Sequence, residues 1–356
     1  TRGLAMVWGR LMSHREFAPV MAIVILWTIF EIFSDVGFFT SSGLMGSVAA
    51  LTSSLGMGAS GVTMLMISGE FDLSVSATFA FAPAIMGRLM SASINDGWDW
   101  PILPALLVAL ALVALIGLVN VLITTYTGVP SFIVTLVKLF FVTTLNLFVF
   151  EWLPGDLVRE TGTLKKILGA DLPGTPLAAP FVWMVGVGVA LAVVLRRTQF
   201  GNWTYSAGNF GGGVARAMGV PVRRVKCTNF VLTAFLAGLG GILQFADFGS
   251  SSQASGIDLN LLAIVAVVIG GTSLFGTRGT IIGSMLGAII LGSVKIGLSI
   301  IKIPSEWYLG LVGALLVVSA ILNARVDTRE AHPHVCLLYT SPSPRDATLS
   351  RMPSSA

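Results

Sequence analysis

The chain has very little charge for its length. Of its 356 residues, 11% are charged and 54% are hydrophobic, and the mean hydropathy is +0.87. Soluble domains carry about 25% charged residues, so this composition excludes a soluble protein of this size. In lipid, the backbone polar groups of a spanning segment must be satisfied within the protein. We therefore predict an all-α polytopic membrane protein.

Cysteine and histidine are also scarce. The two cysteines, Cys227 and Cys336, lie far apart, so a disulfide framework is not expected. The three histidines, at positions 14, 332 and 334, lie outside the apolar segments. We predict no metal site.

Nucleotide and catalytic motifs are missing as well. No Gly-x-x-x-x-Gly-Lys-Ser/Thr loop occurs, and the glycine-rich stretch 270–276 lacks the lysine that such a loop needs. No Gly-x-Ser-x-Gly elbow or Ser/His/Asp set is present either. We predict no catalytic residue and no cofactor on this chain, so any ATP and its magnesium ion would be bound by partner subunits.

Apolar segments of about 20 residues, the length that crosses a bilayer, occur ten times. They are 17–35, 44–67, 73–94, 101–126, 131–151, 177–195, 228–247, 259–275, 280–301 and 306–322. The segments 73–94 and 259–275 are short or glycine-rich, which favours broken or re-entrant helices. We expect a cytoplasmic segment 1–16, a membrane domain 17–325 and a disordered tail 326–356, of which 336–356 looks non-native.

The positions of the basic residues indicate which loops face the cytoplasm. The stretch 198–226 contains no acidic residue, and its basic residues, with the pair just before it, are Arg196, Arg197, Arg216, Arg223, Arg224 and Lys226. The positive-inside rule puts this loop in the cytoplasm. Counting spans outward gives the same side to both termini, to Arg278 and to Arg325. Within spans, Arg88, Lys138 and Lys295 are expected to extend to the headgroups.

Two acidic turns are candidates for a translocation pathway or gate. Glu70, Asp72 and Ser74 lie between two apolar spans, where a carboxylate is costly and faces a cavity or a partner. They could contact a polyhydroxylated solute, or Asp72 and Ser74 could cap the next helix. Asp258 and Asn260 invite the same two interpretations. The similarity of 68–74 to 255–260, five spans apart, indicates an inverted repeat or a coincidence.

Several short motifs, weak one by one, occur in an ordered set: SGEFDLSV at 68–75, VPSFIVTL at 129–136, TQFG at 198–201, GN at 208–209, ARAMGV at 215–220 and VVIGGTS at 267–273. With this order and spacing, residues 17–325 resemble the ribose-type sugar permeases of ABC importers, in the branched-chain amino acid and sugar permease superfamily. The resemblance implies a ten-helix, cobalamin-importer-type fold with inverted repeats.

The resemblance also implies partners and a mechanism. It implies a periplasmic solute-binding protein, two cytoplasmic ATP-binding subunits, and a second permease subunit, identical or not, in a bacterial inner membrane. Alternating access would move a monosaccharide-like solute inward. The ATPase-coupling loop would contain Gly208, Asn209, Ala215, Arg216, Met218, Gly219, Val220 and Arg223.

The loop and the function each leave alternatives. From the residues alone, 214–220 predicts a short helix with Arg216 exposed and Met218 and Val220 on an apolar side, which docks on a partner or rests on anionic lipid. Gly211-Gly212-Gly213 departs from the family pattern and puts the helix start in question. Glu70-Phe71 replaces the Gly-Ile that is commoner in the family.

An ion-coupled secondary transporter and a branched-chain amino acid permease are the rival functions. The solute itself is not readable from the sequence.

Overall fold

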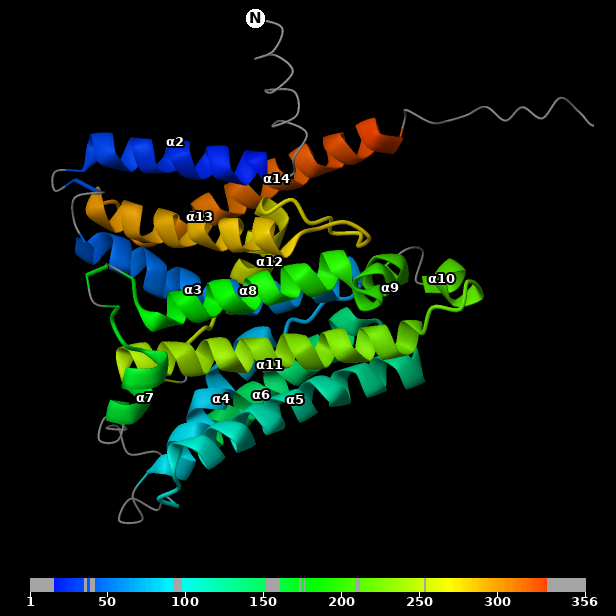
Figure 1. Ribbon diagram of the computed structural model, residues 1–356, viewed down its shortest axis with the longest axis horizontal. Helices are drawn as coiled ribbons and strands as arrows, with labels where there is room; N and C mark the ends of the chain where they lie inside the picture. The colour runs from blue at the N-terminus through cyan, green and yellow to red at the C-terminus, as the bar shows by residue number, and fades with distance from the viewer. Residues whose placement is uncertain are drawn as a thin grey trace, which may run out of the picture.

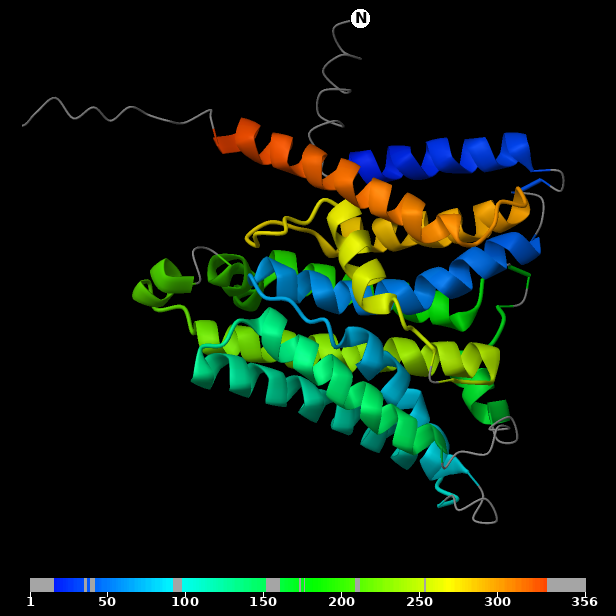
Figure 2. The same cartoon turned by 180° about the vertical axis from the view of Figure 1, so that it is seen from behind.

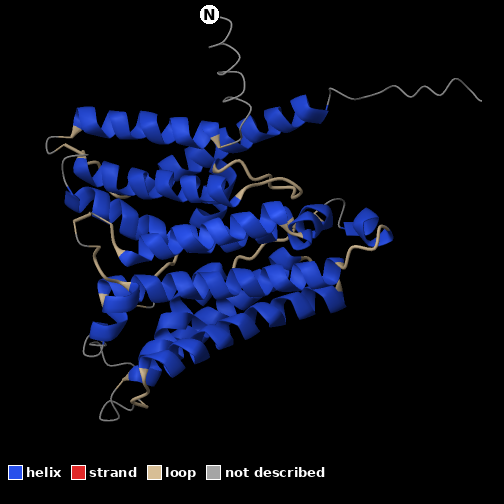
Figure 3. Ribbon diagram, in the orientation of Figure 1, coloured by secondary structure: helices blue, strands red, loops and turns tan. Residues whose placement is uncertain are grey.

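A computed structural model describes residues 16–34, 37–38, 42–91, 98–151, 161–172, 174–175, 177–208, 212–252 and 254–331. These residues form thirteen helices, and their only β pairing is an isolated bridge between Asp171 and Ala178. Figure 3 shows the all-helical character. The predicted N-terminal segment, apart from Glu16, and the tail from 332 lie outside the described residues.

Each of the ten predicted apolar segments overlaps a helix, although several helix ends lie six or more residues from the predicted ones. These helices are α2 (Phe17–Phe33), α3 (Ser42–Ile67), α4 (Val75–Met90), α5 (Ile102–Thr127), α6 (Ser131–Glu151), α8 (Ala179–Arg197), α11 (Val222–Phe248), α12 (Leu259–Ile269), α13 (Ile281–Ile300) and α14 (Trp307–Ala331). Three short helices lie between them: α7 (Thr161–Leu168), α9 (Gln199–Ala207) and α10 (Gly213–Ala217).

Six helices, α3, α5, α6, α8, α11 and α13, are long and apolar enough to cross a bilayer. The apolar parts of α2, α4, α12 and α14 are shorter. At 1.5 Å per residue, α4 is about 24 Å long and α12 about 17 Å, less than the roughly 30 Å of hydrocarbon. The two segments predicted as broken helices are thus the shortest of the ten, and the ten-span count stays a prediction.

Helices α3 and α11 form the centre of the bundle (Figure 1). They approach closely because small residues lie between them: a Cβ on Gly61 of α3 would stand 2.8 Å from the Cα of Thr233. Outside this centre, α5, α6 and α8 expose apolar side chains such as Leu107, Phe140 and Val189. Helix packing in lipid relies on such small residues inside, while the outer face stays apolar.

One end of the bundle collects the predicted cytoplasmic elements. Here α9, α10 and the turns 68–74 and 270–280 lie together, and we call this the loop end (Figure 1). The Thr277 amide donates to the Ile67 carbonyl at 2.9 Å, and the Tyr205 hydroxyl donates to the Gly279 carbonyl at 2.8 Å. Helix α2 begins and α14 ends at this end as well. The basic residues that the sequence assigns to one side therefore share one end of the molecule.

Candidate functional site

Two short helices begin inside the bundle instead of at its surface (Figure 2). Residues 68–74 lead from the loop end to α4, and residues 249–252 and 254–258 lie on the way from the opposite end to α12. The glycine of each Ser-Gly pair adopts a left-handed conformation, with φ of +80° at Gly69 and +74° at Gly256. Glycine adopts this backbone without steric cost. The correspondence supports the predicted inverted repeat, which stays a prediction.

The turn before α4 is closed by polar contacts. Glu70 forms an ion pair with Lys226 of α11, and both side chains are nearly buried, at 11% and 14% exposure. Asp72, which is 2% exposed, accepts from the Ser74 amide at 2.8 Å and from the Ser74 hydroxyl. The side-chain amide of Asn120, on α5, donates from its Nδ2 to Asp72 Oδ2 at 3.3 Å.

Helix α6 holds the same turn from the other side. The Phe71 amide donates to Ser131 Oγ at 3.3 Å, and the Leu73 amide donates to Thr135 Oγ1 at 3.2 Å. Lys138, one turn further along α6, is 9% exposed, and its ammonium lies within electrostatic range of Asp72 without a hydrogen bond. The expectation that Lys138 extends to the headgroups is therefore wrong, because its side chain turns into the bundle toward a carboxylate.

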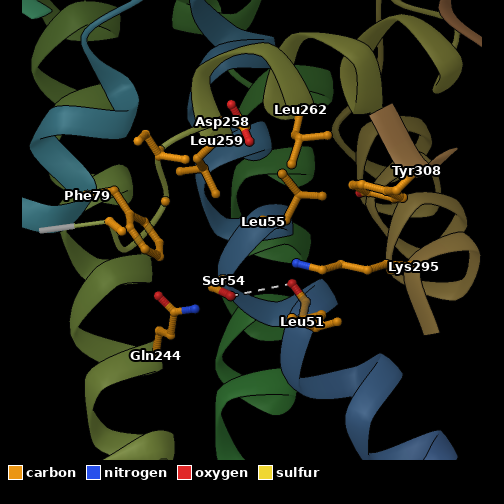
Figure 4. A pocket seen from close by; sticks show the side chains of 14 residues that line it. Leu51, Ser54, Leu55, Phe79, Gln244, Asp258, Leu259, Leu262, Lys295 and Tyr308 are labelled. Carbon is orange, nitrogen blue, oxygen red and sulfur yellow. Dashed lines mark hydrogen bonds between the residues drawn. The ribbon is translucent and has the colours of Figure 1, made fainter. Parts of the chain in front are cut away.

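The turn before α12 instead borders a cavity of about 190 Å³. Its polar wall comes from five elements: Ser54 of α3, Gln244 of α11, Asp258 of the turn, Lys295 of α13 and Tyr308 of α14. Figure 4 shows Gln244 and Lys295 extending from opposite walls toward the middle, with Asp258 on a further side. Lys295 therefore lines a cavity, contrary to the headgroup expectation.

The cavity's strongest polar groups have no hydrogen-bond partner among the residues that the structure describes. Within the described part of the chain, the side chains of Gln244, Asp258 and Lys295 make no hydrogen bond or ion pair, and the Lys295 ammonium stands 5.8 Å from the Tyr308 ring centroid. Such groups are costly in a lipid-embedded protein unless water or a ligand satisfies them. A neighbouring cavity of about 290 Å³ shares Lys295 and Tyr308 and adds Lys302 and Ser305. Together these cavities form a polar recess on the side of the bundle away from the loop end.

The predicted site residues therefore separate into two groups. Asp258 lines the cavity, whereas Asn260, the second residue of α12, does not. Glu70, Asp72 and Ser74 lie in the packed turn. Ser74 occupies the N-cap position of α4, but its side chain makes no capping bond, so that part of the capping interpretation is wrong. Asp72 accepts from the Ser74 amide instead.

Sequence reasoning missed several residues of these sites, among them Ser54, Gln244 and Lys226. Ser54 and Gln244 are polar residues within apolar spans, and that contrast is the signal that could have found them. Lys226 was assigned to the basic loop, yet it lies within α11 and pairs with a residue 156 positions away. No local pattern in the sequence marks such a long-range pair.

The predicted coupling loop is shorter than expected. Helix α11 begins at Val222, so Arg223 is helical and only Gly208, Ala215, Arg216, Met218, Gly219 and Val220 lie before it. Asn209 lies outside the described residues. Ala215 packs against Val222 and Val225, which anchors α10.

The exposed side of α10 is partly apolar. Arg216 is exposed, as predicted, and its Nε donates to the Gly212 carbonyl at 3.2 Å. Met218 is 80% exposed and lies just after the end of the helix at Ala217, so the helix stops before the predicted end at residue 220. Gly212 has φ +74°, and a Cβ there would stand 2.8 Å from Val222 Cγ1. This geometry explains the glycine that departs from the family pattern.

An apolar bundle with two short helices that begin inside it, a closed polar turn and an open polar cavity is the architecture expected of a multi-pass membrane permease. The chain belongs to the family of branched-chain amino acid transport system permease components, whose family model matches residues 44–320. It is thus a permease component of an ABC importer, and it works with ATP-binding and solute-binding partner proteins.

Individual relatives cover most of the chain. It is 33% identical to the xylose/arabinose import permease protein XylH of Sulfolobus acidocaldarius over 86% of this chain and 84% of that protein. It is 31% identical to the ribose import permease protein RbsC of Escherichia coli K12, over 86% and 92%. It is 28% identical to the autoinducer 2 import system permease protein LsrC of Photorhabdus luminescens, over 89% and 92%. No solved structure matches the chain.

Proposed function

We propose that this permease moves a monosaccharide-like solute inward across a bacterial inner membrane. The observation that carries the proposal is the match, over most of their length, to relatives named for import of xylose and arabinose and of ribose. In this proposal a periplasmic binding protein delivers the solute, and two cytoplasmic ATPase subunits bind ATP and magnesium. A second permease subunit, identical or not, completes the pore, and both termini are cytoplasmic.

In the proposed alternating-access mechanism, the two turns mark the closed and the open side of the permease. Glu70, Asp72 and Ser74 close the loop end as an inner gate, while the cavity beside Asp258 is open toward the other side. Lys226 links the gate to the coupling loop, because it lies in the second turn of α11. ATP-dependent closure of the partners, transmitted through α10, would bias the pore between two states. Exposed Val214 and Met218 support docking of α10 on a protein partner.

The test compares energy sources and coupling. Uptake in proteoliposomes with the ATPase partners should be blocked by vanadate and unaffected by an ionophore, and the reverse would establish ion-coupled transport. Gly219 has φ +83°, which proline cannot adopt. Gly219→Pro should therefore distort the coupling loop, and Arg216→Glu reverses the charge of an exposed side chain on α10. Both variants should uncouple ATP hydrolysis from uptake while membrane insertion stays normal. Normal uptake by both variants would overturn the docking role of α10.

The family description favours a second candidate, a branched-chain amino acid. Competition distinguishes the two. If leucine, and not xylose or ribose, competes for uptake, the solute class is wrong while the importer mechanism stands.

A further inference from the structure

Resting on the proposed function, we infer that the cavity bounded by Ser54, Gln244, Asp258, Lys295 and Tyr308 is a solute-binding site within a single permease subunit, and that it takes a small neutral polyol. Its volume of about 190 Å³ lies below the roughly 300 Å³ typical of pockets for drug-sized ligands. A compact solute is therefore the fitting occupant.

The charges of the wall favour a neutral solute. Asp258 and Lys295 bring one charge of each sign and do not pair with one another. Hydroxyl groups can donate to the carboxylate and accept from the ammonium, so a polyol satisfies both without adding a charge. Gln244 adds a donor and an acceptor. A free anion or cation would leave one of the two charged side chains uncompensated.

The distribution of the polar groups favours a polyol over an amino acid. A branched-chain amino acid needs its two charged groups matched at one end and an apolar pocket at the other. Here the polar groups come from five separate elements around the cavity (Figure 4). Apolar wall is interleaved with them, contributed by Leu55, Phe79 and Leu262. A ring with hydroxyls on its perimeter and C–H groups on its faces fits this alternation, since aromatic and aliphatic side chains pack against such faces.

The solute would be held weakly and transiently. Lys295 and Asp258 are exposed in the cavity, so water competes for their hydrogen bonds and the net gain per bond is modest. Weak binding suits a pathway, because a site within a conduit must release what it accepts.

A cysteine-protection experiment tests the site directly. The native Cys227 and Cys336 are replaced by serine, and a single reporter is introduced as Ala254→Cys in the cavity wall or, as the matched control, Lys166→Cys on α7. A charged thiol reagent is applied to the permease in nanodiscs, with and without D-xylose, D-ribose or L-leucine. We expect the pentoses to slow labelling at position 254 several-fold and to leave position 166 unchanged.

Side-chain variants then identify the ligating groups. Gln244→Leu and Lys295→Met, made with the position 254 reporter, should raise the xylose concentration for half-protection at least tenfold, whereas Lys166→Met should leave it unchanged. Protection by leucine alone would overturn the substrate class. If pentoses give no protection while pentose uptake is sensitive to vanadate, the site is wrong and the proposed function stands. If pentoses protect position 254 while uptake is insensitive to vanadate and is abolished by an ionophore, the site stands and the proposed function is wrong.

Discussion

The turn before α4 and the turn before α12 have similar sequences and opposite environments. In the first, Glu70 and Asp72 are buried and fully engaged with α5 and α11. In the second, Asp258 is exposed beside a cavity and has no side-chain hydrogen bond among the described residues. The same kind of residue therefore stabilises the bundle at one turn and stays available for a ligand at the other. Variants in the turn before α4 should therefore change stability, and variants in the turn before α12 should change solute binding.

The largest expected effect comes from breaking the Glu70–Lys226 ion pair. Removing one partner leaves a buried charge uncompensated, which costs about 3–5 kcal/mol. Glu70→Gln and Lys226→Met should each lower the free energy of unfolding by this order, measured by tryptophan fluorescence in detergent on heating. The exchanged pair, Glu70→Lys with Lys226→Glu, should recover much of the loss.

The Glu16–Arg196 ion pair is the matched control. Its side chains are 23% and 49% exposed, and exposed pairs contribute about 0–1 kcal/mol. Glu16→Gln should therefore leave the unfolding curve almost unchanged. Equal losses at Glu16 and Glu70 would mean that burial does not distinguish the two pairs.

The next effect contrasts the two aspartates. Asp72→Ala leaves the Ser74 amide and the Asn120 side chain without their acceptor, and a buried unsatisfied group costs about 1–3 kcal/mol. Asp258→Ala removes an exposed carboxylate, so stability should change by no more than about 0.5 kcal/mol. Unfolding curves of the two variants measure these changes in stability. Asp258→Ala should instead weaken the xylose protection of the reporter at position 254. Loss of stability at Asp258, with protection unchanged, would reverse the assignment of the two turns.

The sequence was sufficient to locate the helices, but it did not show which side chains from different helices contact one another. A lipid solvent requires long apolar helices, so each of the ten segments could be located from its composition. Their ends depended on neighbours: the apolar pattern starts after Lys226, yet α11 begins at Val222 because Val222 and Val225 pack against Ala215.

The candidate site was predictable only in part. Asp258 was found because a carboxylate beside an apolar span is rare. Gln244 and Lys295 face the same cavity from helices that are distant in sequence, and only the packing of both α11 and α13 against α3 brings them together. The role of Lys138 was missed for the same reason, since its carboxylate neighbour lies on another element.

The last contrast concerns the two left-handed glycines. Gly69→Ala and Gly256→Ala should each cost about 1 kcal/mol, because a Cβ disfavours positive φ. Gly174, with φ +78° and no atom within 4 Å of the position that a Cβ would take, is the control in which strain acts alone. Thermal unfolding of Gly174→Ala gives that baseline.

The two glycines should differ in what else they disturb. A Cβ on Gly69 would stand 3.3 Å from the Gly208 Cα, whereas one on Gly256 would stand 2.6 Å from Cδ1 of Phe79, which lines the cavity. Because the Phe79 ring must move, Gly256→Ala should weaken xylose protection at position 254 two- to three-fold, about 0.5 kcal/mol, while Gly69→Ala leaves it unchanged. If both variants alter protection equally, the ring does not shape the cavity, and the difference between the turns is one of stability alone.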